Sequence, residues 1–326
     1  MARPDGASFV SMVSRVNVRL VGARDSVQEA IEDLLGVFAE IEAGCSRFDP
    51  DSDLSRVNAD PAGWHEVSPY CFLTLREAAR AYEATDGLFD PRVLGTLRSL
   101  GYDRSLPFEA GELHLDSAAG AGAGSRADDS LMIDHEVWDP DFDPDRNALR
   151  VGDDPVDLGG IGKGMAVRLA AACLETVADG FLIEAGGDLV VRGDSPRPGG
   201  WRISVEDPQD PARALAMLCL TDTGCVTSSV SVRSWTLQGR HWHHLIDPRT
   251  GRSARGGLLA VTVLHEDPAW AEVWSKAMFI AGAGQVRTIA QDQHLPALWV
   301  REDGRVELTD AMRGSVEWVA DGRFAG

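Results

Sequence analysis

The order of apolar and polar positions along the chain predicts helices interspersed with short strands. Residues 14–20 alternate between apolar and polar side chains and indicate a strand. Over residues 27–41 the apolar positions recur at helical spacing, and Ser26 with Glu29 three residues later matches a capping box. The N-terminal part is therefore expected to form a strand followed by a helix.

Three further helices are expected. Ser68 as N-cap, with Pro69 at the first helical position, begins a helix that ends near Thr85. A glycine-rich stretch leads into an apolar-periodic helix over residues 165–177, and residues 268–280 form a helix later in the chain. Each of these helices has an apolar face that must pack against other elements.

Short strands surround these helices. They are predicted at residues 181–192 as two strands across a Gly186–Gly187 turn, at 201–206, at 258–264, and at 297–307 as a hairpin. The polar stretch 45–58 and the small-residue stretch 221–231 are expected to be loops. Because strands and helices do not alternate regularly, the fold class is expected to be α+β rather than a doubly wound parallel sheet.

Length and composition agree with a soluble globular protein. The chain has 326 residues, of which 44% are hydrophobic and 25% charged, so it can bury a sizeable core. Residues 110–130 are rich in Ala, Gly and Ser and lead into an acidic stretch at 134–145. We therefore predict one domain over residues 1–326 with a surface insertion at about 110–155.

Charge and cysteine usage narrow the function classes. A formal net charge of -20 argues against a nucleic-acid partner, which would need a basic face. The five cysteines are scattered and never spaced as Cys-x-x-Cys, which fits a reducing compartment. The first 20 residues contain no apolar core of signal-peptide length, and no run is long enough for a membrane span. We expect a cytoplasmic protein.

The glycine-rich stretch 156–164 is the first candidate for chemistry. It reads Val-Asp-Leu-Gly-Gly-Ile-Gly-Lys-Gly and stands at the mouth of a predicted helix, where backbone amides and the helix dipole favour a phosphate or diphosphate. Lys163 adds positive charge, and Asp157 can accept hydrogen bonds from a ribose or a base. A nucleotide cofactor site is one interpretation, and a plain strand-to-helix turn is the other.

Two further groups of polar residues occur in the C-terminal half. His243 and His244 are adjacent, so on a strand they face opposite sides and do not easily share a metal ion. His244 can approach Asp247 only if the chain turns between them. Glu272 and Lys276 are four residues apart on the late helix, where the simplest interpretation is a surface ion pair.

Taken together, the motifs resemble the ApbE-like FAD:protein FMN transferases. The resemblance covers about residues 36–282 and follows the order of motifs in that family. The motifs lie at residues 46–55 (Ser-Arg-Phe-Asp-Pro-Asp-Ser-Asp-Leu-Ser), 86–91 (Asp-Gly-Leu-Phe-Asp-Pro), 157–164, 186–188 (Gly-Gly-Asp), 227–228 (Thr-Ser) and 244–251 (His-Leu-Ile-Asp-Pro-Arg-Thr-Gly). Six motifs in register carry far more weight than any one of them.

The resemblance implies an activity, a substrate and a partner. It implies an α+β enzyme that takes FAD as substrate, splits its diphosphate, and attaches FMN through a phosphoester to a Ser or Thr hydroxyl. The acceptor is expected to be a target flavoprotein. Phosphoryl transfer of this kind depends mostly on positioning and on neutralising the charge of the transferring group.

The resemblance also assigns roles to residues of this sequence. It places Phe48 near the isoalloxazine ring of FAD. The residues that match FAD contacts of the family are Leu88, Phe89, Asp90, Asp157, Lys163 and Ile246. Gly160 matches a position whose backbone carbonyl meets the metal, expected to be Mg²⁺.

His244 is our candidate for the base that takes the proton of the acceptor hydroxyl, with Asp247 as its possible orienting group. Imidazole has its ordinary pKa close to neutral pH and suits this role. At this point a purely structural His244 is an equally good interpretation.

The late helix departs from the family pattern. Where family members commonly carry Asp and, four residues later, Thr as metal ligands, this chain has Glu272 and Lys276. A carboxylate can bind Mg²⁺, whereas a protonated ammonium cannot. The bound ion is therefore in doubt, and one hypothesis is that Lys276, held by Glu272, occupies the space of the metal and supplies its charge.

Two other activities would use the same residues. One is a protein that binds FAD or FMN without turnover, which the altered metal positions would explain. The other is an FAD diphosphate hydrolase, in which water replaces the acceptor hydroxyl and the products are free FMN and AMP.

Overall fold

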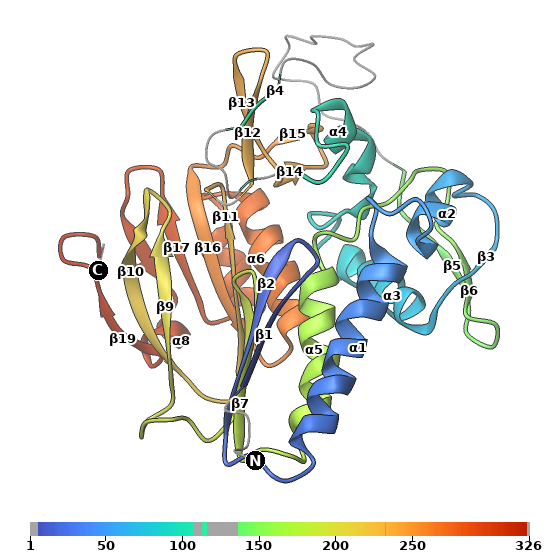
Figure 1. Cartoon of the computed structure of the whole chain (residues 1–326). Helices are drawn as coiled ribbons and strands as arrows, with labels where there is room; N and C mark the ends of the chain where they lie inside the picture. The colour runs from blue at the N-terminus through green and yellow to red at the C-terminus, as the bar shows by residue number, and fades with distance from the viewer. Residues whose placement is uncertain (1–5, 107, 109–112, 116–135, 232, 325–326) are drawn as a thin grey trace.

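The fold is built on one antiparallel sheet of eight strands (Figure 1). The computed structural model describes residues 6–106, 108, 113–115, 136–231 and 233–324. In spatial order the strands are β1 (Gly6–Ser11), β2 (Ser14–Val21), β7 (Gly180–Ala185), β8 (Asp188–Gly193), β11 (Thr223–Ser229), β16 (Leu258–His265), β17 (Ala297–Arg301) and β18 (Val306–Leu308). Every neighbouring pair in this sheet runs antiparallel.

Four long helices pack over one face of this sheet. They are α1 (Val27–Cys45), α3 (Pro69–Ala84), α5 (Gly162–Leu174) and α6 (Pro268–Ala281). The helices α5 and α6 contact the sheet directly, through β7 and β8 and through β11 and β16, and α1 packs on α5. Their apolar faces form the largest part of the core.

A smaller sheet shares a second core with the large one. It consists of β9 (Trp201–Asp207), β10 (Asp210–Leu220) and β19 (Val316–Val319), in the order β19-β10-β9. Inward-facing residues of β9 and β10, such as Trp201 and Leu218, share a hydrophobic cluster with Leu189 and Leu264 of the large sheet. Antiparallel sheets with separately packed helices confirm the α+β class.

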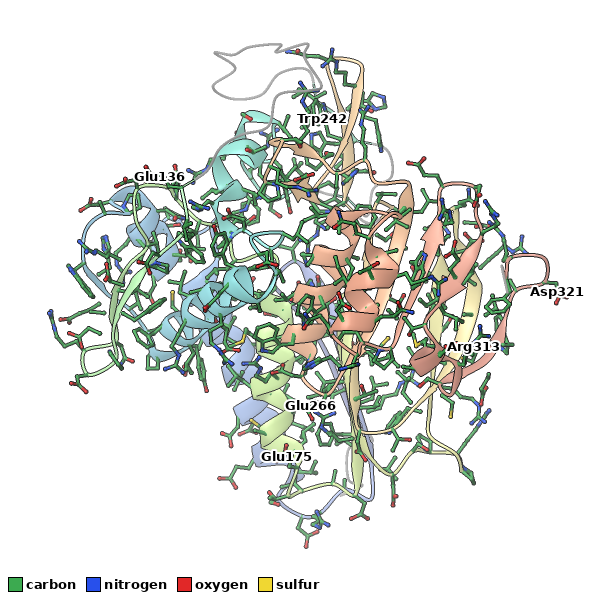
Figure 2. The ribbon with its side chains drawn as sticks, turned by 180° about the vertical axis from the view of Figure 1, so that it is seen from behind. Glu136, Glu175, Trp242, Glu266, Arg313 and Asp321 are labelled. Carbon is green, nitrogen blue, oxygen red and sulfur yellow. The ribbon has the colours of Figure 1, made fainter. Side chains whose placement is uncertain are left out.

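Three small sheets and four short helices complete the described chain. The sheets are β13-β12-β4 (Arg240–His243, Ser234–Leu237 and Leu113–Leu115), β14-β15 (Ile246–Asp247 and Arg252–Ser253) and β3-β6-β5 (His65–Glu66, Ala148–Arg150 and Asp141–Asp143). The short helices are α2 (Asp53–Ala59), α4 (Leu94–Ser99), α7 (Val286–Asp292) and α8 (Asp310–Arg313), with a 3-10 turn at Pro91–Val93 before α4. Figure 2 shows Trp242 of the β12–β13 hairpin at the opposite end of the molecule from Glu175, which follows α5.

The predicted insertion at 110–155 is described only in part, because residues 109–112 and 116–135 lie outside the described residues. Its remaining parts supply β4, β5 and β6, and β4 pairs in parallel with β12. These parts therefore belong to sheets of the fold.

None of the described helices is both long and apolar enough to cross a lipid bilayer. All five cysteines are free thiols.

Two predicted loops contain regular structure. Residues 45–58 include α2, which begins because the Ser52 hydroxyl accepts a hydrogen bond from the Ser55 amide. Residues 221–231 include β11, which lies between β8 and β16 in the large sheet. Small residues are needed there because α6 approaches closely: a Cβ on Gly224 would lie 2.9 Å from the Cα of Pro268.

The two predicted N-caps differ in outcome. Ser68 caps α3, and its hydroxyl accepts a hydrogen bond from the Cys71 amide, as expected. The predicted capping box at Ser26 is wrong, because its side chain makes no capping hydrogen bond and its backbone is not extended. The Val27 amide instead donates to the Arg24 carbonyl in a tight turn before α1.

Candidate active site

A cavity of about 1410 Å³ opens between the β1–β2 hairpin, the glycine-rich turn before α5 and the segment that follows β13. The residues proposed from the sequence that line it are Phe48, Leu88, Phe89, Asp90, Asp157, Gly160, Lys163, His244, Ile246 and Lys276. They come from segments that are up to 228 residues apart, and the fold brings them to one place. Of the proposed residues, Asp247 and Glu272 do not line this cavity.

The glycine-rich turn is shaped by close packing as well as by its position at a helix mouth. Helix α5 begins at Gly162, and a Cβ on Gly164 would lie 2.6 Å from the Cα of Ala269 in α6. A Cβ on Gly160 would lie 2.9 Å from the ring of Phe89. Gly160 and Gly164 are therefore required for packing, and the turn also lines the cavity, so the nucleotide site stays a prediction.

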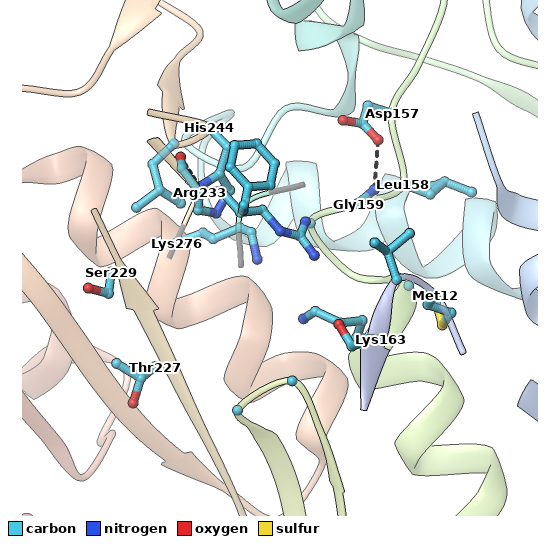
Figure 3. A pocket seen from close by; sticks show the side chains of 18 of the residues that line it. Met12, Asp157, Leu158, Gly159, Lys163, Thr227, Ser229, Arg233, His244 and Lys276 are labelled. Atoms are coloured by element: carbon cyan, nitrogen blue, oxygen red, sulfur yellow. Dashed lines mark hydrogen bonds between the residues drawn. The ribbon is translucent and has the colours of Figure 1, made fainter. Parts of the chain in front are cut away.

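Asp157 is fixed at the start of this turn. Its Oδ1 accepts a hydrogen bond of 2.8 Å from the Gly159 amide (Figure 3), and its Oδ2 lies 3.4 Å from Nε of Arg47. Asp157 is therefore held in place at the rim of the cavity by two contacts within the protein.

A cluster of charged side chains lies between α5, α6 and β8. Lys163 Nζ contacts Asp188 and lies 3.2 Å from Oε1 of Glu272. Lys276 Nζ lies 3.0 Å from the same Oε1, and Oε2 of Glu272 accepts a hydrogen bond of 2.8 Å from the Gly164 amide. The sequence suggested a surface ion pair between Glu272 and Lys276. Glu272 is instead fully buried, so the pair lies inside the protein.

Burial and the neighbouring charges have opposing effects on the pKa values of this cluster. Burial by itself would raise the pKa of Glu272, but Lys163 and Lys276 overcome it and lower that pKa to about 2. Burial opposes the charge of Lys163, but Asp188 and Glu272 outweigh it and raise the Lys163 pKa. Burial raises the pKa of Asp188 to about 6, with Lys163 opposing and Glu272 adding to the effect.

The residues present do not fit a divalent metal at Glu272. Both of its carboxylate oxygens already accept hydrogen bonds, and the groups facing Oε1 are two ammoniums, which have no lone pair to offer a metal. Across the described part of the chain, no group of three or more His, Cys, Asp or Glu side chains is arranged to hold a metal ion. Glu272 is thus not free to bind a metal ion in this structure, and the role of the Gly160 carbonyl stays a prediction.

Arg233 is a site residue that the sequence analysis missed. It lies between β11 and β12, lines the cavity, and extends toward the space between Lys163 and Lys276 (Figure 3). Among the described residues no carboxylate pairs with its guanidinium. The only sequence signal was an arginine placed between the Thr-Ser motif and the histidine-rich stretch. We call Lys163, Arg233 and Lys276 the cation cluster.

His244 and His243 face opposite directions, as predicted. His244 lines the cavity, and its Nδ1 lies 3.3 Å from the backbone carbonyl oxygen of Arg233. His243 is buried, with Nε2 3.0 Å from the carbonyl oxygen of Ala254 and its ring against Phe279. His243 is therefore a structural residue, whereas His244 is available to a ligand.

Asp247 does not orient His244. Its carboxylate makes two hydrogen bonds with Arg249, of 2.9 and 2.8 Å, which close the turn between β14 and β15. The group facing Nδ1 of His244 is the Arg233 carbonyl. The expectation for Asp247 is wrong because the bidentate partner two residues away holds the carboxylate in the turn.

The end of the cavity near Phe48 is aromatic. Tyr102 and Phe108 pack with Phe48 and Trp235 in one cluster. The Arg47 guanidinium lies 4.2 Å from the Phe48 ring centroid, and its buried Nη2 has no hydrogen-bond partner in the described structure. A flat ring with hydrogen-bond acceptors suits this end.

We expect the imidazole of His244 to stay neutral as the pH falls through 6.5, where an ordinary histidine gains a proton. Burial, Arg233 and Lys276 lower its pKa well below 6.5. Because the unfolded chain binds this proton more readily, His244 disfavours the folded state increasingly below that pH. NMR of the histidine ring signals, assigned with a His244→Ala variant, measures the titration, and a midpoint at or above 6.5 would contradict it.

Comparison with known proteins gives a consistent result. The model of the ApbE family matches residues 12–299. A FAD:protein FMN transferase of Rhodobacter capsulatus is 30% identical over 276 residues, which cover 83% of this chain and 50% of that protein. This chain thus spans about half the length of that relative. The enzyme of the same name from Klebsiella pneumoniae is 26% identical, covering 88% of this chain and 81% of that protein.

Solved structures agree on the fold. The ApbE protein of Thermotoga maritima matches with a TM-score of 0.77 at 24% identity, covering 95% of this chain and 98% of that one. The flavin transferase ApbE from Vibrio cholerae matches with a TM-score of 0.74 at 22% identity and the same coverage. At this level of identity the similarity speaks for the architecture alone.

Proposed function

The chain belongs to the ApbE family, and from this premise we propose that it is an FAD:protein FMN transferase. The acceptor hydroxyl oxygen of a Ser or Thr attacks the phosphorus on the FMN side of the FAD diphosphate. The bond from that phosphorus to the bridging oxygen breaks, and AMP leaves with the bridging oxygen. The hydroxyl proton passes to a base on the enzyme.

The observation that carries this proposal is the order of groups in one cavity. The aromatic end at Phe48 and Tyr102 suits the isoalloxazine ring. Arg47, which stacks on Phe48, lies 3.4 Å from Asp157 at the start of the glycine-rich turn, and Gly160 of that turn lies against Lys276. The turn and the cation cluster suit a diphosphate. This sequence of chemistries matches that of a flavin dinucleotide.

His244 is the candidate base, because its lowered pKa keeps the imidazole neutral and able to accept a proton at neutral pH. A backbone carbonyl only accepts hydrogen bonds, so the contact between Nδ1 of His244 and the Arg233 carbonyl places the ring proton on Nδ1. The lone pair is then on Nε2, which can take the proton of the acceptor hydroxyl. Arg233 thereby contributes twice, through its carbonyl to His244 and through its guanidinium to the cation cluster.

Incubation with FAD distinguishes the proposal from its alternatives. The purified protein is mixed with FAD, with and without a flavoprotein that one of the named relatives modifies, and the products are separated by chromatography. We expect AMP release to depend on the acceptor, and flavin fluorescence to stay with the denatured acceptor. FMN and AMP released equally without acceptor would indicate a hydrolase, and intact FAD would indicate a binding protein.

A further inference from the structure

Lysine is rare in this protein, and its positions are informative. The sequence contains only two lysines, Lys163 and Lys276, beside 29 arginines. Both side chains contact the same carboxylate oxygen of Glu272, although they belong to different helices 113 residues apart. Lysine presents a compact charge, whereas the planar fork of arginine requires more room. Two arginines also share a carboxylate at Glu77 and at Glu307, but there each arginine pairs with a different oxygen. At Glu272 the two lysines meet at the same oxygen, where a compact charge fits better than a planar fork.

Glu272 holds these ammoniums in place. It has no solvent exposure, and its second oxygen accepts the Gly164 amide in the first turn of α5. Lys276 also lies against the glycine-rich turn, because a Cβ on Gly160 would lie 3.4 Å from its Cδ and Cε atoms. The Lys276 ammonium is thus positioned beside the turn that faces the diphosphate, with only 15% of its side chain exposed.

The cation cluster leaves this neighbourhood with a net positive charge even without a metal ion. The cation cluster supplies three positive charges, and the buried carboxylates facing it are Asp188 and Glu272. The diphosphate of FAD brings two further negative charges. A divalent ion added at Glu272 would lie within a few ångströms of two ammoniums, where repulsion between fixed charges is strong.

We propose that Lys276 takes the place of a divalent metal in this enzyme, so that binding and cleavage of FAD need no metal ion. The inference rests on the proposed function and specifies how that site neutralises charge. Lys276, fixed by Glu272, faces the diphosphate together with Lys163 and Arg233. It acts through its charge alone, and the bonds formed and broken are those of the transfer already described.

Binding in the presence and absence of metal tests the proposal without relying on turnover. FAD affinity is measured by calorimetry in metal-free buffer with EDTA and again with millimolar Mg²⁺. We expect the two dissociation constants of the wild type to agree within about twofold. Titration with Mn²⁺, followed by the paramagnetic resonance of the free ion, should show no binding to the complex of wild type and FAD.

Substitution of Lys276 is expected to weaken FAD binding or to make it depend on Mg²⁺. Lys276→Met removes the charge and should weaken FAD binding at least tenfold, without rescue by Mg²⁺. Lys276→Asp places a second carboxylate next to Glu272, so FAD binding should become at least tenfold tighter with Mg²⁺ than with EDTA, and Mn²⁺ should bind. Lys276→Thr is the smaller oxygen-bearing variant if the Asp variant does not fold.

A surface arginine provides the matched control. Arg313→Gln removes one positive charge from α8 (Figure 2). Arg313 does not line the cavity, and it contacts the exposed Asp310 and the ring of Phe324. FAD binding by this variant should equal that of the wild type. A wild type that binds or cleaves FAD only with Mg²⁺ would overturn the inference and leave the proposed function intact. Absence of FAD binding under both conditions would overturn both.

Discussion

Replacing His244 by Ala should slow FMN transfer by about two to four orders of magnitude, the range expected for loss of a general base. Affinity for FAD should stay within a fewfold of the wild type, since the aromatic end and the cation cluster are untouched. His244 lines the cavity, and its Nδ1 lies 3.3 Å from the Arg233 carbonyl oxygen. With the ring proton on Nδ1, as proposed above, Nε2 is left to accept a proton.

Single-turnover measurement of covalent flavin on the acceptor, with a separate titration of FAD binding, separates rate from affinity. His241 is a matched control, because it is an exposed histidine on the same hairpin and does not line the cavity. His241→Ala should transfer FMN at the wild-type rate. Unchanged transfer in His244→Ala, or a loss of rate explained by lost FAD affinity, would remove His244 from the role of base.

Replacing Lys163 by Met should have the second large effect, on both stability and FAD binding. Lys163 contacts two buried carboxylates, Asp188 and Glu272, and removing one partner of a buried ion pair costs about 3–5 kcal/mol of folding free energy. The same change removes one of the three charges of the cation cluster, which is proposed to bind the diphosphate of FAD. Denaturant unfolding and FAD titration measure the two losses.

The stability loss of Lys163→Met should depend on pH. Asp188 has a raised pKa in the native wild type, about 6, and loss of Lys163 raises it further. Below pH 6 the carboxyl is neutral in both folded proteins. Above pH 6 the Asp188 carboxyl of the folded wild type ionises, whereas that of the folded variant keeps its proton. The free energy of unfolding of the variant therefore falls further below that of the wild type as the pH rises, by at most about 1.4 kcal/mol per pH unit.

A surface ion pair is the control for this experiment. Arg305 pairs with Asp303 on an exposed turn, and Arg305→Met should be far less destabilising than Lys163→Met. If Lys163→Met were no more destabilising than Arg305→Met, or if its deficit shrank as the pH rose above 6, the buried cluster would not have the charges assigned to it.

Elements with strong local signals could be predicted from the sequence. Helix α3 begins and ends where Ser68, Pro69 and Thr85 indicate, because capping and the fixed backbone of proline act within a few residues. The hairpin β7–β8 turns at Gly186 and Gly187, both with positive φ, as the glycine pair predicted. These features depend little on the rest of the chain.

Features that depend on tertiary contacts could not be predicted. Strand β11 has the composition of a loop, and the close approach of Pro268 and His265 to Gly224 is visible only in the fold. Glu272 and Lys276 have the spacing of a surface ion pair, and their burial depends on Lys163 and Gly164 of another helix. A periodic pattern shows which residues share a helix face and leaves open what that face contacts.

In the candidate site, too, local motifs could be predicted and tertiary contacts could not. The resemblance to a family located most of the cavity residues because their motifs are short and local. Arg233 was missed because it stands outside any motif, and Asp247 was given a role that its contact with Arg249 excludes. The carbonyl of Arg233 contacts His244, and the side chain of Arg249 holds Asp247. The sequence motifs specify neither contact.

The most direct test of this account is a crystal structure of the protein with FAD, grown in EDTA. We expect the diphosphate to lie against the glycine-rich turn within ion-pair distance of Lys163 and Lys276, with the flavin ring beside Phe48. A diphosphate bound elsewhere in the protein, or one that Lys276 does not reach, would contradict it.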